Sequence, residues 1–440
     1  MHANRSPESS TRRRQLNRSI GYVGSMIGLV SLLMGLLMTL PSVWAVWWLS
    51  RPGVLIAEQP WLPIGGGLAA IVFGRRHGLW RIGAWAGLLG VLMAIRPLWH
   101  LPRVNQQHEA AMGDGLAADY LSNTNLPPQA IRTRVGLRAR VINRSKAPSI
   151  IETRDVAFHA THDSRQTLFL DVYQPATMLQ SPRPVIIAIH GGGWNGGNKA
   201  GFFVAHNRHW ARQGYVVFDI QYRLSPDVIW PAHLMDVKTA IRWVRAHASR
   251  YNVDSDRVAL IGRSAGGHLA LMAAFTAGDP EFIAVDNPME RDDVQAVIAV
   301  YAPTDLPRLQ QTVVDPFNYW LGAGLKEAPE VYEKASPLYR AHRGAPPVLL
   351  AHGGQDNLVV PDQSLRLQQR LRDLGVPCAY LYYPWSRHGL DVSLKGLGGH
   401  MLQYDSDRFL AWALHKPDFE TISPKTPLNS KATPSAHDDL

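Results

Sequence analysis

A long stretch of apolar residues lies near the N-terminus of this chain. Residues 20–40 contain no charged side chain, and their length matches the roughly 20 apolar residues that a helix needs to cross a bilayer. Trp44, Trp47 and Trp48 follow, and tryptophan is typical of positions where a helix leaves the bilayer. A cleavable signal peptide, the alternative, has a shorter apolar core followed by small residues. We therefore expect a membrane helix that is retained.

Two further apolar segments follow, and they differ in how continuous they are. Residues 79–96 are strongly apolar, whereas residues 54–73 are interrupted by Glu58 and two prolines. Three arginines lie within residues 75–81, near the junction of these segments. If three helices cross, this junction and the basic N-terminus lie on the same side, which the positive-inside tendency places in the cytoplasm. We expect three crossings, which place the remainder of the chain outside the cytoplasm, whereas two would keep it inside.

From about residue 150 to 415, short apolar runs alternate with stretches that have helical periodicity. The apolar runs are residues 168–173, 185–190, 215–220, 257–262, 296–302, 347–353 and 379–384. The helical patterns cover residues 202–213, 232–250, 265–277, 362–374 and 399–414. Strands that are apolar throughout are buried on both faces, and their alternation with helices is typical of a parallel sheet. This pattern predicts an α/β domain with a mainly parallel sheet and helices on both faces.

The remaining segments complete the predicted organisation. Residues 97–150 contain polar stretches and two adjacent prolines, and we interpret them as a connector. Residues 416–440 are rich in Pro, Ser, Thr, Lys and Asp, which predicts a disordered tail. The sequence therefore predicts a basic cytoplasmic tail at 1–19, a membrane region of two or three helices at 20–96, the connector, a folded domain at 151–415 and the C-terminal tail.

The distribution of charge supports the predicted membrane region. The chain of 440 residues carries a formal net charge of +10. Residues 1–146 contain 17 Lys and Arg against 5 Asp and Glu, whereas residues 147–440 contain 28 against 30. The basic excess thus lies in the same third of the chain as the apolar stretches, which favours contact with a membrane over binding to nucleic acid. We expect the bilayer as a partner, through residues 20–96, and no nucleic acid.

The cysteine and histidine patterns argue against a disulfide framework and a metal centre. Cys378 is the only cysteine, so the chain has no internal disulfide. His159 and His162 form an HxxH pair, but they lie in a polar stretch without the carboxylate pattern that is typical of metal ligands. We therefore expect no metal site.

A single serine marks the point where an apolar run meets a helical pattern, in the stretch "LIGRSAGGHLAL" at residues 260–271. Ser264 lies between Gly262 and Gly266, and glycines leave room for a tight strand-to-helix turn in which side chains would collide. Such a turn presents the serine at the carboxyl end of a strand, where the sites of open α/β sheets lie. The GxSxG pattern alone is weak evidence for a nucleophile, so a base, an acid and an oxyanion site are required elsewhere.

The glycine-rich segment "HGGGWNGG" at residues 190–197 follows another predicted strand and has two interpretations. Its glycines fit the GxGxxG pattern of dinucleotide-binding folds, with Asp219 at the end of the next strand, where such a fold binds ribose. That interpretation leaves His190, the bulky Trp194 and Ser264 unexplained.

The second interpretation of this segment is electrostatic, and it is the one we favour. Acyl transfer places negative charge on a carbonyl oxygen, and backbone N–H groups directed at that oxygen stabilise it. Glycines let the backbone approach closely, and in the lipase-type arrangement such a loop acts together with the residue after the nucleophile. The expected donors are the amides of Gly192, Gly193 and Ala265.

A base and an acid follow the serine in the order that this architecture requires. His388 lies in a loop after the last predicted strand, and Asp356 lies just beyond the end of the strand before it. The order Ser264, Asp356, His388 is that of a nucleophile elbow with its acid and base. The serine hydroxyl needs such a base, and the acid fixes the imidazole tautomer. Weaker candidates are Asp305, Asp362 and Asp391 for the acid and His352 and His400 for the base.

Together these segments resemble the α/β-hydrolase fold, in the group of hormone-sensitive lipases and bacterial carboxylesterases, over residues 168–415. The matching residues are 190–194, 222–226, 262–267, Asp356 and His388. The resemblance implies ester hydrolysis through an acyl-enzyme, with no cofactor. We expect Tyr222 and Arg223 to brace the sheet beside the oxyanion loop, with Asp236 paired to Arg223.

The N-terminal region lies outside this resemblance, and its layout is similar to that of membrane-anchored esterases. We therefore interpret the chain as a multi-pass, membrane-anchored serine carboxylesterase or lipase-like hydrolase with its catalytic domain outside the cytoplasm. The expected substrate is a small-molecule or lipid ester. Three alternatives stay open: a peptidase or amidase with the same triad, a non-catalytic binding module, and a nucleotide-binding domain that uses the loop at 191–196.

Overall fold

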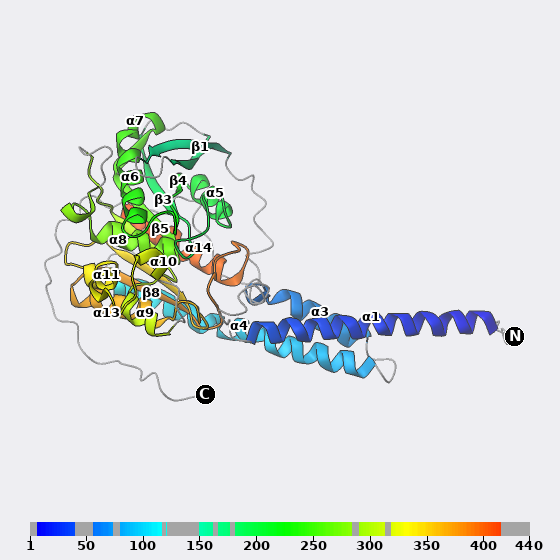
Figure 1. The fold of residues 1–440 in the computed structure, drawn as a ribbon. Coiled ribbons are helices and arrows are strands. Elements are labelled where there is room, and N and C mark those ends of the chain that lie inside the picture. Colours follow the sequence, from blue (N-terminus) through cyan, green and yellow to red (C-terminus); the bar gives the residue numbers. More distant parts are fainter. Residues whose placement is uncertain are drawn as a thin grey trace.

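An eight-stranded sheet lies at the centre of the C-terminal part of the chain, among the residues that the computed structural model describes (Figure 1). Those are residues 7–39, 56–73, 80–116, 120, 149–161, 166–176, 181–283, 290–312 and 318–414. The strands are β1 (Ile150–Ala160), β2 (Thr167–Pro175), β3 (Arg183–Ile189), β4 (Val216–Ile220), β5 (Val253–Arg263), β6 (Ala296–Val300), β7 (Val348–Gly353) and β8 (Cys378–Tyr383).

The sheet is mainly parallel, as the sequence predicts. Its strand order is β1-β2-β4-β3-β5-β6-β7-β8. β2 runs antiparallel to both β1 and β4, and the other neighbouring pairs are parallel. Every residue of β3, β4, β6 and β7 is buried, which is why these strands are mostly apolar rather than alternating. The carboxyl ends of β3, β5 and β7 therefore lie along one edge, where ligands bind in such sheets.

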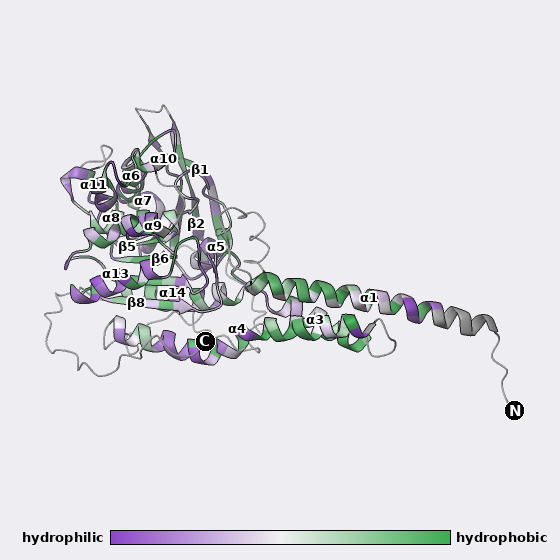
Figure 2. Cartoon of the chain, turned by 60° about the horizontal axis from the view of Figure 1, so that its bottom comes forward, coloured by the Kyte–Doolittle hydropathy of each residue, from purple (hydrophilic) through white to green (hydrophobic). Residues whose placement is uncertain are grey.

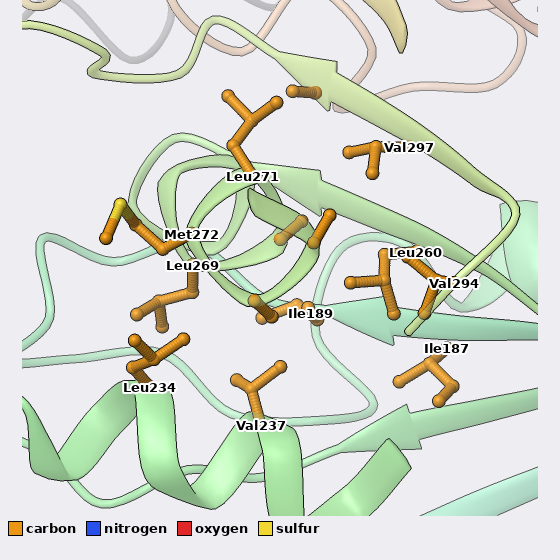
Figure 3. Close-up of a cluster of buried hydrophobic side chains, with 14 of the residues drawn as sticks. Ile187, Ile189, Leu234, Val237, Leu260, Leu269, Leu271, Met272, Val294 and Val297 are labelled. Carbon is orange, nitrogen blue, oxygen red and sulfur yellow. The ribbon is translucent and has the colours of Figure 1, made fainter. Parts of the chain in front are cut away.

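Helices cover both faces of the sheet. One face packs against α6 (Ala232–Ala246), α8 (Ala265–Phe275) and α13 (Asp362–Asp373), and the other against α5 (Val204–Arg212) and α14 (Leu397–Leu414). Figure 3 shows Ile187 and Ile189 of β3 directed toward Leu234 and Val237 of α6. The alternate residue Ile186 packs on the opposite face, as expected from the two-residue period of a strand. Shorter helices complete this domain: α7 (Ala248–Tyr251), α9 (Leu306–Thr312), α10 (Asn318–Leu321), α11 (Pro329–Lys334) and α12 (Pro337–Arg340).

The N-terminal region forms an elongated bundle that extends from the α/β domain (Figure 1, Figure 2). It consists of α1 (Pro7–Thr39), α3 (Trp61–Phe73) and α4 (Trp80–Gly115). Gln15–Met38 and Arg81–Gly115 are long and apolar enough to cross a membrane. α3 has 13 residues, fewer than the roughly 20 that a full crossing needs, so the second expected segment yields only a short helix. The tryptophans at 44, 47 and 48 and the expected tail at 416–440 lie outside the described residues.

Small residues bring the helices of this bundle into close contact. A Cβ atom added at Gly28 of α1 would lie 2.0 Å from the carbonyl oxygen of Gly83 of α4. A Cβ atom at Gly67 of α3 would lie 2.4 Å from the carbonyl oxygen of Gly87. Such close backbone approach is typical of helices packed through small residues, where van der Waals contact supplies much of the attraction. The Ser31 hydroxyl also donates a hydrogen bond across helices, at 2.7 Å, to a backbone carbonyl of α3.

The helix α4 continues into the region that the sequence analysis assigns to a connector. Residues 97–115 belong to this helix despite two internal prolines, and their apolar side chains join the core beside β8 and α14. His108 Nδ1 lies 3.0 Å from Asp405 Oδ2. A Cβ atom at Gly115 would lie 2.2 Å from the carbonyl oxygen of Cys378. The end of α4 thus packs directly against the edge strand of the sheet.

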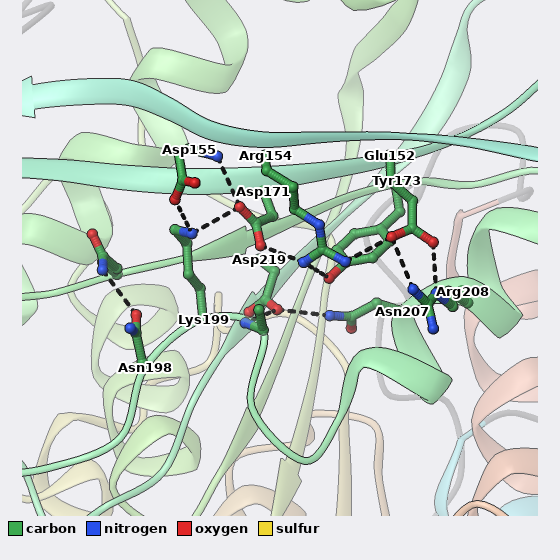
Figure 4. Close-up of polar contacts among 12 residues, drawn as sticks. Glu152, Arg154, Asp155, Asp171, Tyr173, Asn198, Lys199, Asn207, Arg208 and Asp219 are labelled. Atoms are coloured by element: carbon green, nitrogen blue, oxygen red, sulfur yellow. Dashed lines mark hydrogen bonds and ion pairs between the residues drawn. The ribbon is translucent and has the colours of Figure 1, made fainter.

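A network of ion pairs attaches the segment after the glycine-rich loop to the antiparallel strands (Figure 4). Lys199 Nζ lies 2.6 Å from Asp155 Oδ1 and 2.8 Å from Asp171 Oδ1, and Arg154 donates to the other oxygen of Asp171 at 2.6 Å. Burial alone would raise the pKa of Asp171, but its hydrogen bonds with Lys199, the Asp155 amide and Arg154 lower it. The network therefore holds the end of the loop against β1 and β2.

The contrast between Gly65 and Gly67 on α3 provides a test of the bundle packing. A Cβ atom at Gly67 meets the carbonyl oxygen of Gly87, whereas one at Gly65 meets nothing within 4 Å. We expect Gly67→Ala to lower the free energy of unfolding by about 1–3 kcal/mol through overpacking. Gly65→Ala should leave it unchanged or raise it, because alanine is the better helix former. Thermal unfolding of both variants in one detergent measures the difference, and equal midpoints would contradict the close helix contact.

Candidate active site

The site begins at the turn between β5 and α8, where Ser264 has an unusual backbone conformation. Its φ of 54° and ψ of −123° are rare for a residue with a side chain, and such strain persists only where the surroundings determine it. The Ser264 amide donates to the Val300 carbonyl oxygen at 2.9 Å. A Cβ atom at Gly262 would lie 2.0 Å from the Gly266 oxygen, and one at Gly266 would lie 2.3 Å from the Ile189 oxygen. A side chain at either glycine of the motif would therefore clash with a backbone carbonyl group.

His388 connects this serine to a carboxylate. His388 Nε2 lies 2.9 Å from Ser264 Oγ, and His388 Nδ1 lies 2.7 Å from Asp356 Oδ2. Ser264 is partly exposed, whereas His388 and Asp356 are buried. The three side chains come from the ends of β5 and β7 and from the loop after β8. The structure thus brings the three predicted residues together within hydrogen-bond distance.

The surroundings of Asp356 favour its ionised form. Burial alone would raise its pKa, but the neighbouring His388 and His352 hold that pKa well below its usual range. The amides of Leu358 and Val359 both donate to Asp356 Oδ1 at 2.9 Å. One carboxylate oxygen is therefore held by the backbone of its own loop, and the other faces the imidazole of His388. A fixed carboxylate of this kind orients the imidazole and stabilises it when it takes up a proton.

The glycine-rich loop lies beside the serine, and two of its glycine amides have no acceptor among the described residues. Gly192 and Gly193 have φ values of 133° and 61°, a region that glycine enters readily. A Cβ atom at Gly191 would lie 2.7 Å from the Arg263 carbonyl oxygen, so the loop packs against the serine turn itself. Among the described residues, the amides of Gly192, Gly193 and Ala265 donate to no acceptor, and Ala265 begins α8, where amides have no helical partner.

Residues after β4 support this loop, as the sequence predicts. The Tyr222 hydroxyl donates to the His190 carbonyl oxygen at 3.1 Å, and the two rings stack with centroids 4.3 Å apart. Arg223 forms a buried ion pair with Asp236, with Nη2 2.7 Å from Oδ1. The predicted pairing of Arg223 with Asp236 is therefore present. A support that sequence reasoning missed is Tyr319 of α10, whose hydroxyl donates to the Gly193 carbonyl oxygen at 2.5 Å.

The weaker candidates for acid and base have other partners. Asp305 pairs with Arg366 at 2.9 Å. Asp362 pairs with the exposed Arg308 at 2.7 Å. The ring nitrogens of His352 lie 2.7 Å from Ser364 Oγ and 2.8 Å from the Val359 carbonyl oxygen, and His400 lies in the first turn of α14. The histidine that reaches the Ser264 hydroxyl is His388.

Asp391 has a structural partner that the sequence did not predict. Arg263 Nε donates to Asp391 Oδ2 at 2.6 Å, and the Tyr301 hydroxyl donates to Asp391 Oδ1 at 2.7 Å. The ring centroid of Tyr301 lies 4.5 Å from that of His388. Burial alone would raise the pKa of Asp391, but Arg263 lowers it. The sequence did contain one signal for this cluster, because Arg263 directly precedes Ser264 in the motif.

Two positions that a bound dinucleotide would need are already filled by contacts within the protein. Asp219 accepts hydrogen bonds at 2.9 Å from the Ala200 amide and from Asn207 Nδ2, and burial raises its pKa to about 7. A ribose would find this carboxyl group already bonded within the protein. Trp194 is buried and stacks on Trp320 with centroids 4.0 Å apart. Of the HxxH pair, His159 lies in β1 and residue 162 lies outside the described residues.

Comparison with known proteins identifies the family. The family described as BD-FAE matches residues 170–371. Esterase LipC of Mycobacterium tuberculosis is 30% identical over 345 residues, which cover 75% of this chain and 81% of that protein. The chain belongs to the family of α/β-hydrolase esterases. The probable carboxylic ester hydrolase LipM of the same organism is 30% identical over 377 residues, covering 82% of this esterase and 84% of LipM.

Solved structures show the same fold. A bifunctional acetyl ester-xyloside hydrolase from Caldicellulosiruptor lactoaceticus matches with a TM-score of 0.51 and 24% identity, covering 58% of this esterase and 94% of that chain. A truncated carbohydrate esterase from gut microbiota matches with a TM-score of 0.50 and 24% identity, covering 60% and 98%. The esterase is therefore a serine carboxylesterase-like hydrolase of α/β-hydrolase fold, in agreement with the sequence analysis.

Buried neutral histidines near the site predict a loss of stability in acid. Burial lowers the pKa of His268 from 6.5 to about 4. Near pH 5 the folded chain therefore leaves His268 neutral, while the unfolded chain binds a proton at this residue. The stability that depends on this difference is present above about pH 6.5, the ordinary pKa of histidine, and falls as the pH drops toward 4. A histidine paired with a carboxylate has the opposite pH dependence, because its contribution to the stability falls as the pH rises.

The variant His268→Asn removes this titration and isolates its effect. Between pH 7 and pH 5, the unchanged protein should lose about 2 kcal/mol of unfolding free energy that the variant keeps, at roughly 1.36 kcal/mol per pKa unit. Tryptophan fluorescence during denaturant unfolding measures it, because Trp194 donates a hydrogen bond to His268 at 3.3 Å. A difference between the two proteins that is the same at both pH values would contradict the prediction.

Proposed function

We propose that Ser264, His388 and Asp356 catalyse ester hydrolysis in this esterase through a covalent acyl-enzyme. The observation that carries the proposal is the chain of contacts from Ser264 Oγ to His388 at 2.9 Å and on to Asp356 at 2.7 Å. A serine hydroxyl is a weak nucleophile at neutral pH and is activated by a base at this distance. The partial exposure of Ser264 leaves its hydroxyl open to a substrate.

In the first half of the reaction, the Ser264 oxygen attacks the ester carbonyl carbon while His388 Nε2 takes the hydroxyl proton. The tetrahedral intermediate then collapses, and His388 gives this proton to the departing alcohol. The ester C–O bond is broken, and the acyl group stays on Ser264. Such acid–base assistance contributes roughly 10²–10⁴-fold to the rate, and Asp356 stabilises the imidazolium formed on the way.

In the second half, a water molecule attacks the acyl-enzyme. His388 takes a proton from the water, and the same proton returns to Ser264 as the acid product leaves. Atoms balance with water as the only co-reactant, so the cycle needs no redox partner.

We assign the stabilisation of the tetrahedral oxyanion to the amides of Gly192, Gly193 and Ala265. The support is that these amides have no acceptor among the described residues, and that Gly191, which directly precedes Gly192, packs against the Ser264 turn. An unpaired N–H group directed at a developing negative charge stabilises a transition state by roughly 3–4 kcal/mol per donor. The hydrogen bond from Tyr319 to the Gly193 carbonyl helps to fix the orientation of this loop.

We further propose that the bundle anchors the esterase in a bilayer through residues 20–96 by three crossings, with the short α3 as the returning one, which places the catalytic domain outside the cytoplasm. In support, Gly28 lies beside Gly83 and Gly35 beside Gly90, so α1 and α4 run in the same direction. Two helices with the length and apolarity of membrane spans support anchoring. Leu29, Leu33, Leu89 and Leu92 of these helices are among the large apolar side chains that are exposed, and such surfaces belong against lipid or protein. An esterase held at a membrane meets lipid or other surface-bound esters most often, and we propose these as its substrates.

Hydrolysis by Ser264 is tested with p-nitrophenyl esters of graded acyl length and the full chain in detergent micelles. We expect Ser264→Ala to lower kcat by roughly 10⁴-fold or more, because a triad acts as a unit. The exposed Ser249 provides a matched control, and Ser249→Ala should behave as the unchanged protein. Equal rates for Ser264→Ala and the unchanged protein would remove Ser264 from the mechanism. Faster cleavage of matched p-nitroanilides than of the esters would favour the amidase alternative.

The proposed orientation is tested by labelling introduced cysteines. Cys378 is buried and thus protected from a membrane-impermeant maleimide, while Lys326 is exposed and Ser6 lies in the predicted N-terminal tail before the first candidate span. In intact cells, Lys326→Cys in the catalytic domain should react, and Ser6→Cys should react only after the membrane is made permeable. The reverse pattern would place the catalytic domain in the cytoplasm. Labelling at both positions without permeabilisation would contradict the anchoring itself.

A further inference from the structure

The segment around His388 contacts the N-terminal bundle through one buried acidic side chain, Glu58. This residue precedes α3, and only 1% of its surface is exposed. The Ser386 hydroxyl donates to Glu58 Oε1 at 2.7 Å, and the Gly398 amide donates to Glu58 Oε2 at 2.5 Å. The Leu397 amide donates to the Glu58 carbonyl oxygen at 2.9 Å. A residue more than 300 positions away in the sequence thus binds both sides of the histidine segment.

Two glycines of the catalytic domain leave the space that this contact needs. A Cβ atom at Gly398 would lie 2.8 Å from Glu58 Oε2, and one at Gly396 would lie 2.9 Å from Glu58 Cβ. A side chain at either position would therefore displace the acidic group. Burying an ionisable side chain is unfavourable unless its polar atoms are hydrogen bonded, and both carboxyl oxygens of Glu58 accept hydrogen bonds here. The surroundings are shaped for a carboxyl group at this position.

Ser386 links Glu58 to the catalytic side chains. It is buried and lies two residues before His388. Its carbonyl oxygen accepts a hydrogen bond at 2.9 Å from the amide of Gln355, the residue before Asp356. Ser386 is thus held by the bundle through its side chain and by the loop of the triad acid through its backbone. Movement of Ser386 would shift the imidazole relative to both of its partners.

We propose that Glu58 is a positioning residue for the hydrolytic reaction. Its carboxyl group, supplied by the N-terminal bundle, holds the segment that carries His388 in line with the nucleophile. The inference rests on the serine hydrolase function proposed above and adds to it a dependence of acyl transfer on the docking of the bundle. The bundle is then part of the support of the active site as well as an anchor.

Three variants of the full chain in detergent micelles test this role. Glu58→Ala removes both side-chain acceptors, and we expect kcat to fall by roughly 10–100-fold, the effect of a small misplacement of catalytic groups, with KM within about twofold. Glu58→Gln should retain most of the activity, because its amide oxygen accepts from Gly398 and its amide nitrogen donates to the Ser386 hydroxyl. Leu62→Ala changes an exposed side chain in the same region and serves as the matched control.

The measurement is kcat per active site, with sites counted by titration with a fluorophosphonate. The rate of this labelling reports the alignment of nucleophile and base without the deacylation step. A residue that only stabilises the fold would change the number of titrated sites or the thermal midpoint and leave kcat per site unchanged. A positioning residue lowers both kcat per site and the labelling rate, and Glu58→Gln restores them.

Each outcome supports or overturns the inference. Unchanged kcat per site in Glu58→Ala overturns it, and so does a loss in Glu58→Gln as large as that in Glu58→Ala. If Glu58→Ala does not fold, Ser386→Ala decides, because it removes the side-chain donor and keeps the Gly398 contact; we expect about a tenfold loss, and no loss overturns the inference. Full activity of Ser264→Ala would refute the proposed function itself, whereas an inactive Ser264→Ala with fully active Glu58→Ala refutes only the role of Glu58.

Discussion

The geometry of the site depends on three backbone segments that approach too closely for any side chain to lie between them. Gly262 faces the Gly266 carbonyl, Gly266 faces that of Ile189, and Gly191 faces that of Arg263. The end of β3, the end of β5 and the start of α8 therefore pack backbone against backbone. The positive φ of Ser264 follows from this crowding, because the chain must reverse direction within one residue. The strain is held by the parallel register of β3, β5 and β6, which fixes where each strand ends.

A second constraint, a buried ion pair, holds the loop of His388 close to the turn of Ser264. Arg263 precedes Ser264, Asp391 follows His388 by three residues, and the two charges form a buried ion pair. Removing one partner of such a pair leaves an uncompensated charge in the core, which is strongly destabilising. The Arg263 guanidinium also lies over the Phe203 ring at 3.9 Å, which adds a cation–π attraction. The turn that carries Ser264 and the loop that carries His388 are therefore tied together independently of the hydrogen bond between these two residues.

The sequence predicted those features that depend on local pattern. Continuous apolar runs identified the buried strands, and the glycine spacing around Ser264 identified the tight turn. Both features depend on the types of neighbouring residues and can therefore be recognised in the sequence. Most partners of buried polar groups cannot be recognised in this way, although the pairing of Arg223 with Asp236 was predicted correctly. Asp391 looked unsuitable as the triad acid from chain order, yet nothing in the sequence paired it with Arg263. The two prolines of α4 and its polar residues concealed the continuation of the predicted helix beyond residue 96, because the burial of that part depends on β8 and α14, which lie far along the chain.

The N-terminal bundle contacts the α/β domain at the edge strand β8. The edge strand β8 exposes unpaired backbone groups unless another element covers it, and α4 packs there through Gly115 and the His108–Asp405 pair. Glu58 adds a separate contact at the histidine segment. Because α4 is continuous from the bundle to this edge, the bundle and the sheet cannot rotate freely about each other. The match to LipM covers 82% of this chain, whereas the solved folds cover about 60%, so the similarity reaches beyond the α/β domain. The bundle is also bonded beside His388, which fixes the orientation of the candidate site relative to the helices.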